Sequence, residues 1–320
     1  MAKKIVTIVG ATGSQGISII NALSGKAELQ LRGLTRDSSS ANAQALAAKG
    51  VEIIQANLDD PASIKSAFAG SHIIYAITDF FKPFARSGAD EAMAIETRHG
   101  ITMAEAAAAT PTLEQYIWST LPDWDTLTGG KYPVPHAKSK VHVDLHIRQN
   151  LPDLAAKTTF FWITFYHSNL LYPNFNPVFV ESANAWAQIQ CQDPDTPVLV
   201  IGDIRANAGK FVEAIIEQRE KTVGKFVLAE VESTTSGKYL QAWADVKGVK
   251  SVYVKTDVNT YNALWPGWSE EMGVMMQAWE YLKEKSWTSA HGEEILTKED
   301  LGITGLVGLE ESYKTLKFPE

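Results

Sequence analysis

The first half of the chain alternates short apolar runs with stretches in which apolar residues recur at helical spacing. The apolar runs are rich in β-branched residues and predict buried strands over residues 5–9, 29–35, 51–55, 72–77 and 115–119. The helical spacing between them predicts helices over residues 16–23, 41–49, 61–68 and 89–109. Strands that alternate with helices form right-handed βαβ units, whose parallel sheet is covered on both faces. The pattern therefore predicts an α/β fold with a doubly wound parallel sheet.

The pattern becomes less regular after Ser119. The predicted elements of this part are a loop (122–135), two helices (136–149 and 209–218) and two apolar strands (158–164 and 198–202). Residues 165–197 are rich in Pro, Asn and aromatic side chains, and Trp265, Trp268 and Trp279 lie in the mixed pattern beyond residue 226. Because ligands of open α/β sheets bind at the carboxyl ends of the strands, we interpret this part as a smaller mixed α+β lobe that faces the substrate.

These patterns divide the chain into two predicted units. Residues 1–157 are expected to form the nucleotide-binding domain, and residues 158–320 are expected to form mostly the substrate-binding lobe. One or two strands and a helix of the second unit, near residues 158–164 and 198–218, are expected to return to the main sheet.

Composition and charge exclude several classes of protein. The chain carries 29 basic and 37 acidic residues, a net charge of −8, without a dense Lys/Arg cluster, so we predict no direct nucleic-acid binding. No run of about 18 apolar residues occurs, which predicts no membrane-spanning helix. The single Cys191 cannot form an internal disulfide and suits a reducing compartment, so the cytoplasm is the predicted location.

A glycine-rich turn, Gly10-Ala-Thr-Gly13-Ser-Gln-Gly16, follows the first predicted strand and opens the first helix. Glycines at this spacing permit a tight turn, close approach of the backbone to a diphosphate, and contact between helix and strand. The positive helix end then faces the phosphates. A turn that only lets the helix pack closely would explain Gly16 but not all three glycines. The motif therefore predicts a dinucleotide site.

The end of the second predicted strand bears on the choice of dinucleotide. Sites selective for NAD usually offer Asp or Glu here to the ribose hydroxyls, whereas this chain has Arg36, whose planar guanidinium suits a phosphate. NADP(H) is therefore the predicted cofactor. The alternative is a solvated Arg36, with Asp37 taking the ribose role.

Several motifs together resemble the NmrA-like family of atypical short-chain dehydrogenases/reductases. They are the glycine turn at 10–16, Leu-Thr-Arg at 34–36, the segment 50–60, Tyr-Ile-Trp-Ser-Thr-Leu-Pro-Asp at 116–123, and the helix that holds Lys140. The resemblance implies a Rossmann-type domain with NADP(H) in the cleft. It further implies that the diphosphate is held by Thr12, Gly13, Ser14, Gln15 and Gly16, and the 2′-phosphate by Arg36. Asn57 and Leu58 are expected near the adenine, Thr78 near the nicotinamide ribose, and Lys140 on the ribose hydroxyls.

The chain has a different residue at the position of the usual catalytic tyrosine. Ordinary short-chain dehydrogenases place a Tyr four residues before the Lys, where the ammonium lowers the pKa of the phenol. Here that position holds His136. An imidazole can donate a proton to a substrate, so His136 is either a proton donor or only a residue at the start of a helix. Ser119 and Thr120, at the end of the fifth predicted strand, either bind a substrate carbonyl or are structural.

Other candidate residues surround the expected cleft. Phe80 and Phe81 form either an apolar wall beside the nicotinamide or a loop anchor, and Tyr166, His167 and Asn169 follow the sixth predicted strand at the edge of the cleft. His142 and His146 have the i, i+4 spacing of two zinc ligands, but neither the usual Glu nor a third ligand is evident, so no metal is predicted.

Two functional hypotheses remain. The first is an NADPH-dependent reductase of a carbonyl, enone or imine in a small, apolar or aromatic substrate. The second is a non-catalytic NADP(H)-sensing regulator that acts through a protein partner, because the family contains both kinds. The sequence leaves the substrate, the transferred hydride face, homo-oligomer formation and the partner open.

Overall fold

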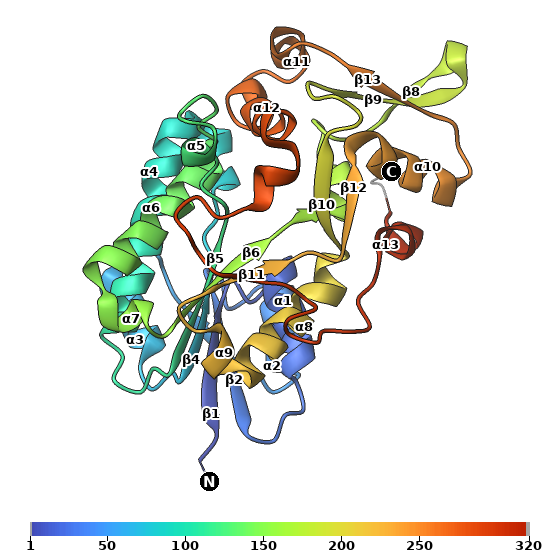
Figure 1. Ribbon diagram of the computed structural model, residues 1–320. Helices are drawn as coiled ribbons and strands as arrows, with labels where there is room; N and C mark the ends of the chain where they lie inside the picture. The colour runs from blue at the N-terminus through green and yellow to red at the C-terminus, as the bar shows by residue number, and fades with distance from the viewer. Residues whose placement is uncertain (1, 318–320) are drawn as a thin grey trace.

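The computed structural model describes residues 2–317. Its centre is an eight-stranded sheet in which every neighbouring pair is parallel (Figure 1). The order across the sheet is β14-β11-β6-β5-β4-β1-β2-β3. The bounds are β1 (Lys4–Val9), β2 (Leu29–Thr35), β3 (Glu52–Gln55), β4 (Ile73–Ala76), β5 (Gln115–Thr120), β6 (Thr158–Ile163), β11 (Phe226–Ala229) and β14 (Ile295–Leu296). The predicted doubly wound Rossmann-type sheet is confirmed.

Helices cover both faces of this sheet, which is why its strands are apolar on both sides. One face carries α3 (Pro61–Phe68), α4 (Phe81–Ala108), α6 (Pro135–Asn150) and α7 (Pro152–Ala155) (Figure 1). The other face carries α1 (Ser14–Leu23), α2 (Ala41–Ala47) and α8 (Ile204–Glu217), and α8 is followed by the short α9 (Arg219–Thr222). Helices α1 and α8 approach closely at Gly209, where a Cβ would lie 2.7 Å from the backbone carbon of Ser18. Gly209 is therefore required for this packing.

The fourth helix begins earlier than its periodicity predicts. Helix α4 starts at Phe81 instead of residue 89, and the chain breaks helical geometry once, at Gly88, with φ 79° and ψ −177°. Pro83 lies in the first turn, where a missing amide hydrogen costs little. The predicted loop at 122–135 also contains a short helix, α5 (Trp124–Leu127). The break at Gly88 thus divides α4 into a short first segment and a longer second one.

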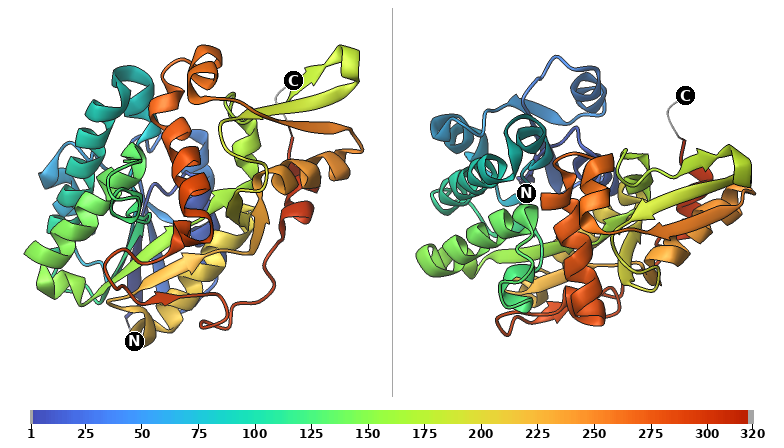
Figure 2. Two further views of the ribbon diagram at one scale, coloured as in Figure 1. Left: turned by 45° about the horizontal axis from the view of Figure 1, so that its top comes forward. Right: turned by 90° about the horizontal axis from the view of Figure 1, so that it is seen from above.

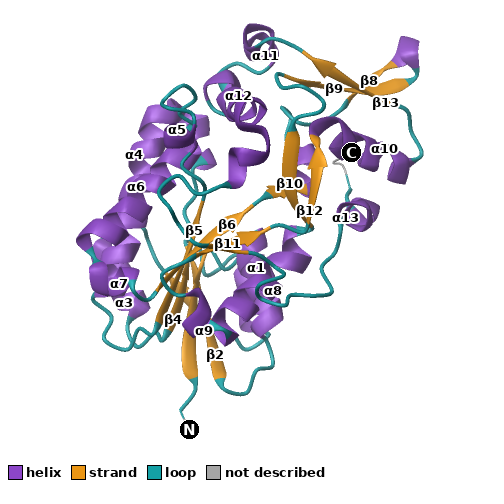
Figure 3. Cartoon of the chain, in the orientation of Figure 1, coloured by secondary structure: helices purple, strands orange, loops and turns teal. Residues whose placement is uncertain are grey.

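The second half contributes two smaller sheets (Figures 2 and 3). One has the order β12-β10-β7 and the other β13-β9-β8, and the latter projects from the body. The strands are β7 (Phe165–Tyr166), β8 (Val178–Val180), β9 (Ala185–Gln190), β10 (Pro197–Gly202), β12 (Glu232–Thr235) and β13 (Ser251–Lys255). The helices are α10 (Ser236–Lys247), α11 (Val258–Leu264), α12 (Met272–Leu282), α13 (Leu309–Thr315), and the 3-10 turns η1 (His167–Leu171), η2 (Glu181–Ala183), η3 (Trp268–Glu270) and η4 (Lys283–Trp287). This is the predicted mixed C-terminal lobe.

Of the one or two strands expected to return to the main sheet, near residues 158–164 and 198–218, the first returns and the second does not. Strand β6 does enter the main sheet, between β5 and β11, and α8 packs on α1. Strand β10 does not: it pairs with β7 and β12 in the separate three-stranded sheet. An apolar strand is buried in either sheet, so its sequence does not say which neighbours it pairs with.

No helix in the part of the chain that the structure describes combines the length and the apolar character needed to cross a membrane.

Candidate functional site

The glycine turn joins β1 to α1 and forms a bare backbone cradle. Gly10 has φ +67°, a conformation that favours glycine, and the Gly13 amide donates to the Gly10 carbonyl at 2.9 Å. A Cβ on Gly16 would lie 2.7 Å from the Cα of Ala11. Gly13 is the N-cap of α1, and no side chain caps this helix. The amide groups of the first turn are therefore left for an anion, which is the arrangement that a dinucleotide diphosphate requires.

Gln15 connects this turn to three strands. Its amide nitrogen donates to the Tyr166 hydroxyl at 2.6 Å, and its amide oxygen accepts from Ser119 Oγ at 3.3 Å and from the Tyr75 hydroxyl. Burial raises the pKa of Tyr166 to about 12, so this phenol remains protonated at neutral pH. The structure thus brings the predicted residues Gln15, Ser119 and Tyr166 together. Thr12 and Ser14 lie in the same turn, on either side of Gly13.

Thr78 and Lys140 also meet, around a carboxylate that the sequence did not reveal. Lys140 Nζ lies 2.9 Å from Thr78 Oγ1 and 3.0 Å from Glu96 Oε1, and Thr78 donates to the same Glu96 oxygen at 2.7 Å. Ser139 donates to the second oxygen, Glu96 Oε2. Glu96 is completely buried, whereas Lys140 keeps 12% of its side chain exposed. Thr78 lies two residues after the end of β4, so the ammonium lies at the carboxyl edge of the sheet.

His136 lies one helical turn before Lys140 and has its own carboxylate. Its Nδ1 contacts Glu271 Oε1, from the residue before α12. The rings of Phe80, Phe81 and Trp124 surround it, with centroids 6.0, 5.7 and 6.2 Å from the imidazole. Phe80 is buried, and Phe81 is 39% exposed. The two predicted phenylalanines therefore form an aromatic wall beside His136.

Thr120 is not part of this group. Successive side chains of a strand point to opposite faces, so Thr120 points away from Ser119. Thr120 Oγ1 donates to Asp144 Oδ2 at 2.9 Å, and Trp118 Nε1 donates to Oδ1 of the same carboxyl at 2.7 Å. Burial raises the pKa of Asp144 to about 8. The Thr120 hydroxyl is thus engaged with a residue of α6, which favours the structural alternative for this residue over contact with a substrate carbonyl.

Of the three residues predicted after β6, one reaches the site. Tyr166 bonds to Gln15, but His167 is buried and its Nδ1 lies 2.8 Å from the Gly202 carbonyl, against the ring of Tyr313. Asn169 lies half-buried on the 3-10 turn η1. His167 therefore holds β10 to the turn, and its predicted contact with substrate is not supported by the geometry.

The predicted adenosine end lies at the carboxyl ends of β2 and β3. Arg36 is 65% exposed, and its Nη2 is 3.7 Å from Asp79 Oδ2. Asp37 turns to its own loop, where it accepts from the amide and hydroxyl of Ser39 at 2.8 and 2.6 Å, and these hydrogen bonds lower its pKa. Asn57 Oδ1 accepts from the Asp59 amide at 3.1 Å, and Leu58 packs against the core. Arg36 is thus the side chain that remains available for a ligand.

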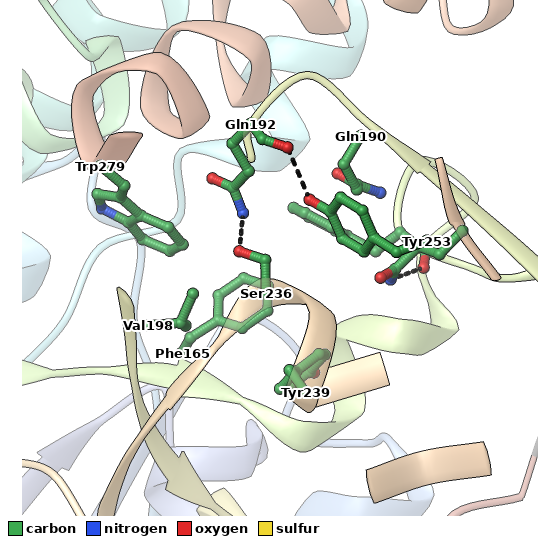
Figure 4. Close-up of a pocket in the computed structure, with 10 residues that line it drawn as sticks. Phe165, Gln190, Gln192, Val198, Ser236, Tyr239, Tyr253 and Trp279 are labelled. Atoms are coloured by element: carbon green, nitrogen blue, oxygen red, sulfur yellow. Dashed lines mark hydrogen bonds between the residues drawn. The ribbon is translucent and has the colours of Figure 1, made fainter. Parts of the chain in front are cut away.

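A separate cavity lies in the C-terminal lobe, between β9, β10 and α10 (Figure 4). Its volume of about 20 Å³ is room for one water molecule. The side-chain oxygens of Gln190 and Gln192 are buried there without a hydrogen-bond partner among residues 2–317. Buried acceptors of this kind are usually satisfied by a bound water in proteins, and the cavity is too small for an organic substrate. Within the same described range, no group of three or more His, Cys, Asp or Glu is placed to hold a metal ion.

The model of the NmrA-like family matches residues 2–298. The chain belongs to the NmrA-like family. The predicted resemblance is confirmed, and the match extends well beyond the motifs of the first half.

Curated relatives within this family are named as oxidoreductases. The chain is 26% identical over 258 residues to the NmrA-like family domain-containing oxidoreductase hkm9 of Aspergillus hancockii, covering 78% of this chain and 74% of that protein. It is 33% identical over 152 residues to the corresponding oxidoreductase himF of Aspergillus japonicus, covering 46% of this chain. That second match spans only 43% of the relative.

Solved structures share the fold of this NmrA-like protein. NmrA, described as a negative transcriptional regulator and crystallised with NADP, has a TM-score of 0.74 at 21% identity, covering 99% of this chain and 96% of that chain. The NADPH-dependent quinone oxidoreductase QOR2 of Escherichia coli, crystallised with NADPH, has a TM-score of 0.67 at 18% identity, covering 96% of this chain and 98% of that chain.

Sequence reasoning missed three residues of the site: Tyr75, Glu96 and Glu271. Glu96 had a signal, because it lies at the four-residue spacing of the buried Ala92 and Gly100 on α4, where a charged residue is unusual. No comparable signal marks Glu271, whose partner lies 135 residues earlier in the chain.

Proposed function

We propose that this protein is an NADP(H)-dependent reductase of a carbonyl, enone or imine in a small, apolar or aromatic substrate. The observation that carries the proposal is the pairing of His136 and Lys140 one turn apart on α6, each with a buried carboxylate partner. Lys140 beside Thr78 and the cradle at Gly10–Gly16 support the cofactor assignment, as do the NADP and NADPH bound to NmrA and QOR2. The names of the fungal relatives support an oxidoreductase.

In this proposal the chain supplies binding, orientation and a proton. The first turn of α1 holds the diphosphate, Arg36 the 2′-phosphate, and Lys140 the ribose hydroxyls. When bound, the nicotinamide supplies the hydride. His136 donates the proton, and the aromatic wall of Phe80 and Phe81 excludes water from the substrate. The division into a nucleotide-binding domain (1–157) and a mainly substrate-binding lobe belongs to the same proposal.

The direct test is oxidation of NADPH in the presence of a panel of quinones, enones, ketones and imines. We expect turnover of at least one of them. His136→Ala should lower kcat by about 10²–10⁴-fold, the usual contribution of a general acid, while NADPH binding is retained. Lys140→Met should weaken NADPH binding as well. Tight NADPH binding without turnover of any acceptor would contradict the enzymatic proposal.

Arg36→Ala tests the choice of cofactor. Because a charge-assisted hydrogen bond contributes about 1.5–3 kcal/mol, we expect NADP(H) to bind more weakly by this amount and NAD(H) to bind almost unchanged. Calorimetric titration of both cofactors measures the difference. Lys82→Ala is the matched control, because Lys82 is exposed and also lies near Asp79, at 3.9 Å. Equal losses for NADP(H) and NAD(H) in Arg36→Ala would remove the phosphate assignment.

The second candidate is a regulator that senses NADP(H) and acts on a protein partner. The observation that favours it is the absence of the usual Tyr, together with the similarity to NmrA. The projecting β8 strand also exposes Val178, Phe179 and Val180, which an apolar partner surface could cover. The acceptor panel distinguishes the two functions, because only the reductase oxidises NADPH.

A further inference from the structure

We propose that Glu271 is a positioning residue for His136, and that the two form a proton-transfer dyad in place of the usual tyrosine. The inference rests on the proposed function only in giving His136 the role of proton donor. Its basis is the placement of a buried carboxylate of the C-terminal lobe against one nitrogen of an imidazole on α6.

The contact assigns different roles to the two imidazole nitrogens. Glu271 is completely buried, and its Oε1 lies against His136 Nδ1. In the proposed dyad the carboxylate accepts in this contact, which places the proton on Nδ1. No hydrogen bond to Nε2 is formed within residues 2–317. Nε2 is therefore the nitrogen left to exchange a proton with a substrate.

The surroundings hold the ring in this orientation. Trp124 packs edge-on against both the His136 imidazole and Trp279 of α12, at 6.2 and 5.9 Å. Phe81 also lies against the imidazole and stacks on Trp268, at 5.7 and 6.3 Å. Residues from both halves of the chain thus enclose the dyad, and the C-terminal lobe supplies its carboxylate.

Lys140 and His136, which both lie on α6, each have a carboxylate partner of their own. Lys140 is paired with Glu96 at 3.0 Å, so Glu271 is left to His136. Glu271 Oε2 is buried and has no hydrogen-bond partner among residues 2–317. Glu271 therefore interacts with the His136 imidazole through its side chain. It stabilises the imidazolium that a proton donor must form before each turnover.

For a carbonyl substrate, bound NADPH would supply the hydride for the new C–H bond as the C=O π bond breaks, and would be left as NADP⁺. The Nε2–H bond of the imidazolium breaks as the new O–H bond forms. His136 becomes neutral with its Nδ1–H still directed to Glu271, and a proton from solvent then restores the imidazolium.

Nitrogen-15 NMR of the whole protein labelled at histidine tests the dyad without any substrate. The chain has seven histidines, and the His136 signals are identified by their loss in His136→Asn. We expect neutral His136 to carry its proton on Nδ1. A spectrum in which neutral His136 is protonated mainly on Nε2 would overturn the proposal, whatever the outcome of the acceptor panel.

Kinetics test the dyad on any acceptor that is turned over. Glu271→Gln should lower kcat by about tenfold to a hundredfold, which is part of the 10²–10⁴ that a general acid contributes, with little change in KM for NADPH. Glu270→Gln, at the exposed neighbouring carboxylate, is the matched control and should leave kcat unchanged.

In a double-mutant cycle, His136→Ala with Glu271→Gln should be no slower than His136→Ala alone. Additive losses would show that Glu271 acts independently of His136 and would overturn the dyad while leaving the reductase in place. Where Glu271→Gln fails to fold, Glu271→Asp, which keeps the carboxylate, replaces it in the same cycle.

Discussion

Glu96→Gln is expected to lower the free energy of unfolding by about 3–5 kcal/mol, the usual cost of removing one partner of a buried ion pair. The substitution keeps the shape of the side chain but leaves the Lys140 ammonium without its buried counter-charge. It also alters the hydrogen bonds that Thr78 and Ser139 donate to the carboxylate. Urea unfolding measures the loss, and NADPH titration should show weaker binding because Lys140 is no longer held beside Thr78.

Glu114→Gln is the matched control for this prediction. Glu114 pairs with Lys4 on the surface, where their side chains are 36% and 51% exposed. Exposed pairs contribute about 0–1 kcal/mol, so this variant should unfold almost like the native protein. Similar losses in the two variants would mean that Glu96 does not hold a buried charge.

The free energy of unfolding of Asp144→Asn is expected to rise relative to that of the native protein as the pH increases from about 5 to about 9. In the unfolded chain an aspartate has a pKa near 3.9 and is ionised over this range. In the folded protein, burial raises the pKa of Asp144 to about 8, so the side chain keeps its proton below that pH. The folded state therefore binds more protons, and native stability falls as the pH rises, by up to about 1.4 kcal/mol per pH unit. The fall ends above the folded pKa, after a total of a few kcal/mol.

An asparagine fits the same contacts without titrating. Its amide oxygen can accept from Trp118 Nε1, and its amide nitrogen can donate to Thr120 Oγ1. Urea unfolding of both proteins at several pH values measures the difference between them. Asp153→Asn removes a carboxylate from an exposed position and should not show this slope. A difference between native protein and Asp144→Asn that stays constant with pH would contradict the raised pKa.

Much of the fold was predictable because its signals are local. Each βα unit of the first half carries its own apolar run and helical spacing, so β1 to β5 were expected close to where they occur. The second half was less predictable, since β10 has the apolar character of a main-sheet strand and pairs elsewhere. Pairing across long stretches of chain depends on the neighbours that the whole fold provides.

The candidate site likewise has features with a local sequence signal and features that depend on tertiary packing. The cradle of Gly10, Gly13 and Gly16 was predictable because its glycines lie within seven residues of sequence and the backbone of the turn requires them. The hydrogen bonds of Thr120 to Asp144 and of His167 to the Gly202 carbonyl were not predictable in this way. Which face of β5 meets α6, and which strand the turn after β6 packs against, depend on tertiary packing.

By itself, the amino-acid sequence determined the parallel sheet, the glycine turn, and the one-turn spacing of His136 and Lys140 on a helix, because these features depend on residues close together in the chain. Only the tertiary structure decided the partners of those two side chains. Glu96 reaches Lys140 from α4, and Glu271 reaches His136 from the C-terminal lobe. A buried basic group must have a partner, but no local rule selects which carboxylate the fold will bring to it.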